Sequence, residues 1–145
     1  MMIKDNPLTK QGIDFELDHI GIATPSLDEG KRIYEALSLG DPEVEEVPTE
    51  KVRVAMYELA NGARIELLEP THPDSPVAKF LSRRGPGIHH ICLRVKDLRK
   101  VMDELLAGGV RLTSQEPKPG AHGCWVTFVH PSEAGGVLLE LSQRP

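Results

Sequence analysis

Two histidines and two glutamates recur at matched places in the two halves of the chain. The segment Asp18-His19-Ile20 returns 71 residues later as His89-His90-Ile91. Each half also ends in an apolar run with one embedded acid, which is Glu66 in the first half and Glu140 in the second. Imidazole nitrogens and carboxylate oxygens together are typical ligands of a divalent metal ion. The repeat therefore predicts a metal site made by His19, Glu66, His90 and Glu140.

Each of these four residues lies opposite the apolar side chains of its own predicted strand. His19, for example, alternates with Ile20 and Ile22, and successive side chains of a strand point to opposite faces. Burying four ionisable groups without a partner would be costly, which favours a shared metal over four unrelated side chains. Four such ligands leave two octahedral positions for water or substrate oxygens. The set suits Co, Mn, Ni, Fe or Zn and does not select among them.

An anionic substrate at such a site would need positive donors, because the two carboxylates already neutralise a dication. The candidates are Arg53, Arg94 and Lys118. His122, in a loop rich in glycine and proline, is either a donor to the substrate or an ordinary loop residue. His89 has the opposite parity from His90, and we expect it to be a strand-edge residue or a donor to its neighbour.

The elements that position these residues follow the order strand, helix, strand, strand, strand in each half. In the first half, Ser26 is a suitable N-cap for an amphipathic helix that Gly40 ends, and Asn61-Gly62 predicts a hairpin turn. The predicted elements are a strand over Phe15–Ala23, a helix from Leu27 to Gly40, a short strand within Asp41–Val47, and strands over Val52–Leu59 and Ala63–Leu68.

The second half repeats the pattern after a linker, residues 70–87, that holds a short helix capped by Ser75. Its predicted elements are a strand over His89–Val95, a helix over Leu98–Ala107, a loop around Lys118–Gly123, a strand over Cys124–Val129, a turn over Glu133–Gly136 and a strand over Val137–Leu141. We predict an α+β fold of two paired βαβββ modules, residues 15–69 and 88–143. Pairing would form an open, barrel-like sheet around a metal cavity in one compact domain. Met1 to Asp14 is expected to be a loose lead-in.

The composition of the chain argues against several classes of protein. The 145 residues carry a net charge of −5 without a basic stripe, which argues against nucleic acid as a partner. Cys92 and Cys124 are too few for a disulfide framework and are expected to be thiols. No apolar run reaches 18 residues and the N-terminus lacks the apolar core of a signal peptide. We therefore expect a soluble, cytoplasmic protein that does not enter a membrane.

Longer motifs give the chain a family resemblance over Phe15 to Gln143. They are Asp74-Ser75-Pro76-Val77-Ala78-Lys79-Phe80-Leu81, Gly87-Ile88-His89-His90-Ile91, Gly120-Ala121-His122-Gly123, His130-Pro131 and Gly135-Gly136-Val137-Leu138-Leu139-Glu140-Leu141. With the repeated strand–helix units, they resemble the vicinal oxygen chelate superfamily, which has a glyoxalase-like fold. Within it, the chain is most similar to the methylmalonyl-CoA epimerases.

The resemblance implies that the chain interconverts the 2R and 2S forms of methylmalonyl-CoA, a step of propionate metabolism, by moving the C2 proton. A divalent metal that holds the substrate oxygens would stabilise the enolate, and one base is needed on each face of that planar intermediate. By resemblance Glu140 is both a metal ligand and one base. The second base is Glu50, although Thr49 aligns better with the family position. The resemblance also implies a CoA thioester as substrate and a homodimer.

Three other functions are compatible with the same fold. The nearest is a glyoxalase I-type lyase that acts on a glutathione hemithioacetal with the same ligands. A non-catalytic protein that binds small molecules would have no reason to keep four convergent ligands. An iron-dependent extradiol dioxygenase uses two histidines and one glutamate, and the additional Glu66 argues against it.

Overall fold

The computed structural model describes residues 13–145, and residues 1–12, most of the predicted lead-in, lie outside the described part. The described chain divides into two compact units. The first unit is residues 18–92, and the second unit combines residues 13–17 with residues 93–145. The α+β class and the βαβββ order of both predicted modules are confirmed.

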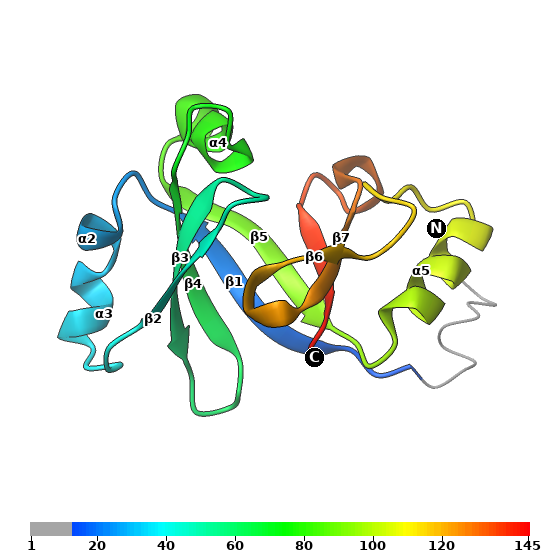
Figure 1. The fold of residues 1–145 in the computed structure, drawn as a ribbon, viewed down its shortest axis with the longest axis horizontal. Coiled ribbons are helices and arrows are strands. Elements are labelled where there is room, and N and C mark those ends of the chain that lie inside the picture. The colour runs from blue at the N-terminus through cyan, green and yellow to red at the C-terminus, as the bar shows by residue number, and fades with distance from the viewer. Residues whose placement is uncertain (1–12) are drawn as a thin grey trace. The chain divides into compact units, whose positions relative to one another are not determined.

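The first unit contains a five-stranded sheet in the order β2-β3-β4-β1-β5 (Figure 1). Strand β1 pairs in parallel with β4, whereas β3 pairs antiparallel with both β2 and β4. The boundary between the units falls near one end of β1 and of β5. The elements are β1 (Glu16–Ala23), α2 (Leu27–Gly30), α3 (Arg32–Ala36), β2 (Glu43–Val47), β3 (Val52–Glu58), β4 (Arg64–Pro70), α4 (Pro76–Arg84) and β5 (Gly87–Arg94).

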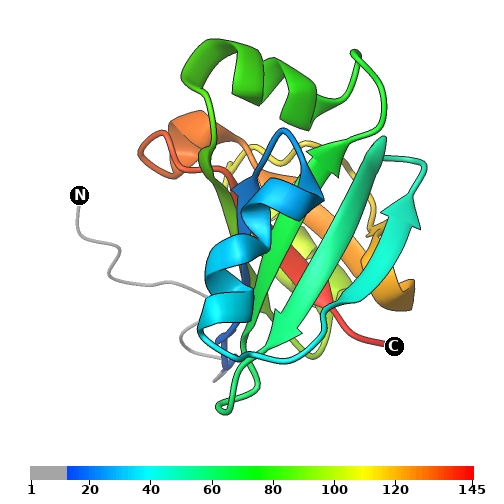
Figure 2. The ribbon, with the colours of Figure 1, turned by 90° about the vertical axis from the view of Figure 1, so that its left-hand side faces the viewer.

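Helices α2 and α3 lie across one face of this sheet (Figure 2). Leu27 of α2 packs with Tyr57 and Leu67 of the strands beneath. The predicted continuous helix from Leu27 to Gly40 is wrong, because the chain forms two short helices that meet at Lys31 and end at Ala36. Gly30 stands at the break, and glycine is a poor residue for a helix interior.

Three local predictions in the first unit are confirmed. Gly62 has a left-handed φ of +85°, and the backbone N–H of Leu59 donates to the carbonyl of Ala63 at 2.8 Å, which closes the hairpin turn. Ser75 caps α4, since its hydroxyl accepts from the backbone N–H of Val77 at 3.2 Å. The short strand predicted within residues 41–47 is β2.

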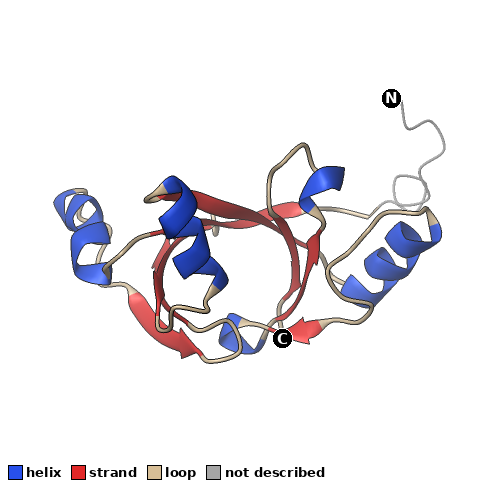
Figure 3. Cartoon of the chain, turned by 90° about the horizontal axis from the view of Figure 1, so that it is seen from above, coloured by secondary structure: helices blue, strands red, loops and turns tan. Residues whose placement is uncertain are grey.

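The second unit places one helix beside a small sheet (Figure 3). The strands of this sheet are antiparallel and follow the order β8-β7-β6. Leu98, Val101 and Met102 of the helix form a buried cluster with Val129 of β7 and Leu141 of β8. The elements are α5 (Leu98–Ala107), β6 (Lys118–Pro119), a 3-10 turn over Ala121–Gly123, β7 (Trp125–Val129), a 3-10 turn over Pro131–Glu133 and β8 (Leu139–Gln143). Among the described residues, no helix is both long and apolar enough to cross a membrane.

The strands of the second unit differ from prediction in several details. The predicted loop at Lys118 contains the two-residue strand β6. Strand β8 begins two residues after the predicted Val137, because Gly135 and Gly136 both adopt left-handed φ values and the Val137 N–H donates to Ala134. At its other end, β8 extends two residues beyond the predicted Leu141, to Gln143. The side-chain oxygen of Gln143 accepts a hydrogen bond from the backbone N–H of Leu98 at 2.8 Å.

Candidate metal centre

His19 and His90 face each other from two neighbouring strands of the first unit. Strand β1 carries His19 and the adjacent strand β5 carries His90. The two Nε2 atoms lie 2.9 Å apart, and the ring planes are almost perpendicular. Both side chains are buried, with 6% and 7% of their surface exposed. The structure thus brings together two of the predicted ligands through the nitrogens that a metal would use.

The distance between these nitrogens fits two neighbouring ligands of one ion. Metal–imidazole bonds are about 2.0–2.1 Å long. Two such bonds at a right angle, as in octahedral coordination, place their nitrogens about 2.9 Å apart, whereas a tetrahedral angle would place them about 3.4 Å apart. The histidine pair is therefore compatible with a divalent ion that has cis nitrogen ligands.

Gly21 provides the space in which the His90 ring lies. A Cβ atom added at Gly21 would stand 2.2 Å from Cε1 of His90 and 2.6 Å from its Nδ1. Gly21 follows His19 by two residues and thus has the same strand parity. Close approach of another group is one reason for glycine inside a strand. The small residue beside His19 therefore accommodates the second histidine.

An ionic network surrounds the other nitrogen of His19. Asp18 is fully buried, and its Oδ2 lies 2.7 Å from Nδ1 of His19. The same oxygen accepts a 2.7 Å hydrogen bond from Nη2 of Arg64, which parallel pairing of β1 and β4 places directly beside His19. Neither Asp18 nor Arg64 was among the site residues predicted from sequence. The sequence contains one signal for this pair. Asp18 lies next to His19 on the apolar face of its strand, and a buried carboxylate requires a partner.

The network also fixes the charge of Asp18. Burial by itself would raise the pKa of the Asp18 carboxyl, but hydrogen bonds from His19 and Arg64, together with the positive charge of Arg64, hold that pKa well below its usual range. Opposite charge and hydrogen bonds to the ionised form both act in this direction. Asp18 is consequently an anion throughout the neutral range.

Glu66 belongs to the same network. Its Oε2 lies 3.2 Å from Nδ1 of His19 and 3.3 Å from Nη2 of Arg64, and only 4% of the residue is exposed. These contacts are on the Nδ1 side of the His19 ring, away from the nitrogen that faces His90. By formal charge, two carboxylates, one guanidinium and a neutral His19 sum to one net negative charge, which suits a cation.

The two predicted bases lie in different units. Glu140 is a buried residue of β8 in the second unit, opposite Phe128 of β7. Glu50 belongs to the first unit, in the turn before β3, and is half-buried. Its backbone carbonyl accepts from the hydroxyl of Ser75 at 3.3 Å. The roles of both glutamates in binding and catalysis remain predictions.

The predicted substrate donors are distributed over both units. Arg53 is exposed on β3, with Nη1 4.0 Å from Oε2 of Glu69. Arg94 lies at the end of β5 and donates from Nη2 to Oε2 of Glu16 at 2.6 Å. Lys118 is exposed on β6, and His122 is half-buried with a left-handed φ of +57°. Their contact with a substrate stays a prediction.

His89 contacts its neighbour rather than standing alone at the strand edge. Its Nδ1 lies 2.9 Å from Nδ1 of His90. On the other side, its ring meets Phe80 of α4 edge-on, with 5.1 Å between the ring centroids. The expected role of His89 as a donor to His90 is therefore compatible with the geometry.

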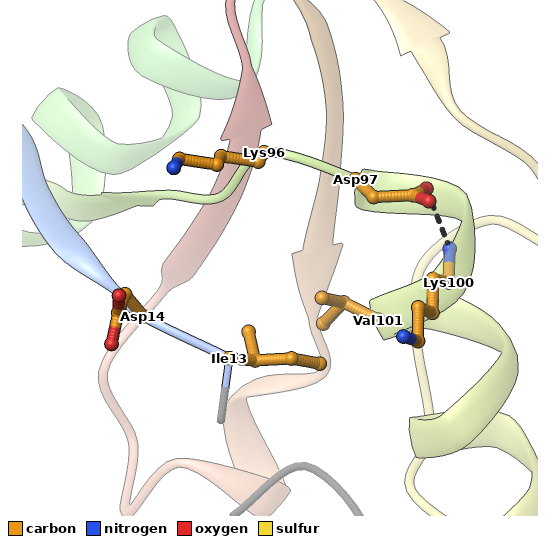
Figure 4. A pocket seen from close by; sticks show the side chains of 6 residues that line it. All are labelled: Ile13, Asp14, Lys96, Asp97, Lys100 and Val101. Atoms are coloured by element: carbon orange, nitrogen blue, oxygen red, sulfur yellow. Dashed lines mark hydrogen bonds between the residues drawn. The ribbon is translucent and has the colours of Figure 1, made fainter. Parts of the chain in front are cut away.

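A cavity of about 250 Å³ lies in the second unit (Figure 4). It is lined by Ile13, Asp14, Lys96, Asp97, Lys100 and Val101. Asp97 caps α5, since its Oδ1 accepts from the backbone N–H of Lys100 at 3.1 Å. None of the predicted ligands, bases or substrate donors is among the residues that line this cavity.

The fold and the histidine pair agree with a known family. Residues 18–128 match the glyoxalase/bleomycin resistance protein/dioxygenase superfamily, which is the superfamily of the predicted resemblance. The chain belongs to this superfamily.

Similar proteins within the family are methylmalonyl-CoA epimerases. The chain is 42% identical over 132 residues to the ethylmalonyl-CoA/methylmalonyl-CoA epimerase of Cereibacter sphaeroides, covering 88% of this chain and 96% of that protein. It is 40% identical over 130 residues to the human mitochondrial methylmalonyl-CoA epimerase, covering 88% and 73%. A variant of the Streptomyces coelicolor methylmalonyl-CoA epimerase, solved in complex with 2-nitronate-propionyl-CoA, has a TM-score of 0.83 at 36% identity and covers 89% of this chain and 94% of that one.

Proposed function

We propose that the protein is a metal-dependent epimerase that interconverts (2R)- and (2S)-methylmalonyl-CoA. The observation that carries the proposal is the buried pair of His19 and His90, whose Nε2 atoms are 2.9 Å apart. The relatives named as epimerases of this substrate support the choice of reaction. A divalent ion at this site would act as a Lewis acid on the substrate oxygens and stabilise the enolate.

Each predicted residue has a defined part in this proposal. His19, Glu66, His90 and Glu140 would hold the metal ion. Glu140 would also exchange the C2 proton on one face of the substrate, and Glu50 would do so on the other, because inversion needs one base on each side of the planar intermediate. Arg53, Arg94, Lys118 and His122 would contact the anionic thioester.

Exchange of the C2 proton tests the reaction directly. The purified protein, loaded with Co(II), is incubated with (2S)-methylmalonyl-CoA in deuterated water and followed by NMR. We expect deuterium to enter C2 while the 2R form accumulates, and both processes should stop after the metal is removed with a chelator. A metal-loaded protein that does neither would contradict the proposal. Turnover of the glutathione hemithioacetal of methylglyoxal instead would assign a glyoxalase I-type lyase.

The second base is tested by Glu50→Gln, which keeps the shape of the side chain and removes its proton acceptor. We expect turnover to fall at least about a hundredfold, as for loss of a general base, while the metal content stays that of the original protein. Glu46→Gln, an exposed acid of β2, serves as the matched control. Unchanged turnover of Glu50→Gln would show that Glu50 is not the second base. The neighbouring Thr49 would then be the next candidate.

Three further properties belong to the same proposal. The metal is Co, Mn, Ni or Zn, to be determined by elemental analysis after purification without chelators. The protein acts as a homodimer of 16.0 kDa chains, for which sedimentation equilibrium should give twice the chain mass. It works in the cytoplasm, which fractionation of cells that produce it would test.

A further inference from the structure

Ser75 makes two hydrogen bonds with one buried hydroxyl. Its oxygen accepts from the backbone N–H of Val77 at 3.2 Å, which caps α4. The hydroxyl also donates to the backbone carbonyl of Glu50 at 3.3 Å. Capping needs only an acceptor, so the bond to Glu50 is a separate use of the same side chain. Ser75 is fully buried, and solvent therefore does not compete for either bond.

The carbonyl that this hydroxyl holds belongs to a peptide unit that is bonded at both ends. The unit joins Glu50 to Lys51, and the N–H of Lys51 donates to the carbonyl of Pro48 at 3.2 Å. The next carbonyl, that of Lys51, accepts from the N–H of Thr71 at 2.8 Å. The turn before β3 is thus attached at two successive carbonyls to the segment that leads into α4.

The turn contains a backbone conformation that needs such support. Lys51 has a left-handed φ of +55°, which is uncommon for a residue with a Cβ atom. Reorientation of the peptide unit between Glu50 and Lys51 would change the ψ of Glu50 and the φ of Lys51 together, and could return Lys51 to the ordinary range. It would also turn the Glu50 carbonyl away from Ser75. The hydrogen bond from Ser75 therefore stabilises the left-handed turn.

The orientation of this peptide unit affects where the Glu50 side chain stands. A change in the ψ of Glu50 alters the path of the main chain between the turn and β3, and a displacement of about 1 Å at a catalytic group can cost about a hundredfold in rate. Inversion needs one base on each face of the planar intermediate. A displaced Glu50 would leave only the other face served by a base.

We infer that Ser75 positions Glu50 as the second base of the epimerisation. The inference rests on the proposed function, since it takes Glu50 to be that base. Ser75 is a positioning residue in this account, because it acts on the reaction only through the main chain of Glu50.

Loss of one base has a stereochemical signature that general damage lacks. The remaining carboxylate still takes the C2 proton of the epimer on its own side, exchanges it with deuterated water and returns a deuteron to the same face. Inversion of that epimer requires a proton or deuteron from the displaced base, and it slows. For one epimer the ratio of inversion to exchange therefore falls. Partial unfolding or loss of metal lowers both rates by the same factor.

Ser75→Gly tests the inference, because glycine is an acceptable N-cap but has no hydroxyl to donate. The Co(II)-loaded variant is incubated with each epimer of methylmalonyl-CoA in deuterated water. Mass spectrometry measures exchange and circular dichroism measures inversion. We expect the ratio of inversion to exchange to fall at least about tenfold for one epimer. Ser82→Ala, at an exposed position of α4, is the matched control and should keep the original ratio.

Two further variants keep the test decisive. Ser75→Cys has a similar shape but is a much weaker donor, so it should lower the ratio even if Ser75→Gly does not fold. Lys51→Gly in the Ser75→Gly background should restore the ratio, because glycine takes a left-handed φ without strain. An unchanged ratio in a folded Ser75 variant, or an equal loss of exchange and inversion from both epimers, would overturn the inference.

Glu50→Gln, measured in the same way, separates this inference from the proposed function. If the original protein neither exchanges nor inverts the substrate, the proposed function fails. If Glu50→Gln keeps the original ratio, Glu50 is not the second base and the inference fails with that role. If Glu50→Gln lowers the ratio and Ser75→Gly does not, the function and the base stand, and the positioning role of Ser75 alone fails.

Discussion

At the scale of single residues, the candidate centre depends on Gly21 as much as on the histidines themselves. Gly21 has no Cβ, and the ring of His90 occupies the place where one would be. Glycine in the interior of a strand lowers the stability of that strand. The close approach of the His90 ring is therefore the structural reason for glycine at this position. Gly21 is therefore the position at which the histidine pair is most sensitive to a minimal change.

Replacement of Gly21 by alanine should displace the His90 ring. The added methyl carbon would stand 2.2 Å from Cε1 of His90, far inside van der Waals contact, while the extended backbone itself accepts alanine. We expect a folded protein whose metal affinity falls at least about tenfold, as measured by calorimetric titration with Co(II). Gly87→Ala, in β5 with no atom near its added carbon, should bind metal normally. Equal affinities of the two variants would contradict this account.

At the scale of elements, one strand carries a polar group into the hydrophobic core. Tyr57 of β3 is 1% exposed and packs under α2 and α3, with its ring 5.1 Å from that of Tyr34. Among the described residues, its hydroxyl has no hydrogen-bond partner. Burial raises the pKa of Tyr57, and the negative charge of Glu35 adds to the effect. The packing of the ring therefore stabilises β3 in spite of its hydroxyl.

Tyr57→Phe should consequently stabilise the protein. Leaving a buried polar group unsatisfied costs about 1–3 kcal/mol, and phenylalanine keeps the ring contacts while removing that cost. We expect the free energy of unfolding in urea to rise by about 1 kcal/mol. Tyr34→Phe, at a half-buried position, should change it by less than about 0.5 kcal/mol. A loss of stability in Tyr57→Phe would mean that the hydroxyl has a partner in solution.

Much of the element order was predictable, because strand alternation, turns and caps are local signals. The repeat and the parity of β1 and β5 were sufficient to pair His19 with His90. Three features were missed. Gly30 and the pair Gly135-Gly136 are local signals for the break in the first helix and for the late start of β8, but a glycine by itself does not tell whether an element ends there or continues. The pairing of Asp18 with Arg64 depends on the register of β1 and β4, which a single sequence does not reveal.

At the scale of the whole molecule, metal binding should be linked to stability. An ion that binds only the folded chain stabilises it by an amount set by its concentration relative to its dissociation constant. The net negative charge of the buried cluster of Asp18, Arg64 and Glu66 acts in the same direction, because a cation relieves it. Folding and metal loading are therefore expected to depend on each other.

Thermal unfolding measures this linkage. At a free Zn(II) concentration about 100 times the dissociation constant, the stabilisation is about 2.7 kcal/mol, which raises Tm by roughly 5 to 11 °C for a chain of this size. His90→Ala should lose this increase together with the metal. His72→Ala, at a side chain that is 54% exposed, should keep it. An equal increase in both variants would place the metal elsewhere.

The turn that carries Glu50 determines how this residue can move. The N–H of Glu50 donates to Val47, the N–H of Lys51 donates to Pro48 and the N–H of Thr71 donates to Lys51. With the hydroxyl of Ser75 on the carbonyl of Glu50, the main chain is held on both sides of the residue. If Glu50 is the proposed second base, its carboxylate can reach a substrate by rotation of its own side-chain bonds, which takes nanoseconds or less. We therefore do not expect motion of this turn to limit turnover, which should be independent of solvent viscosity unless substrate binding or product release is the slow step.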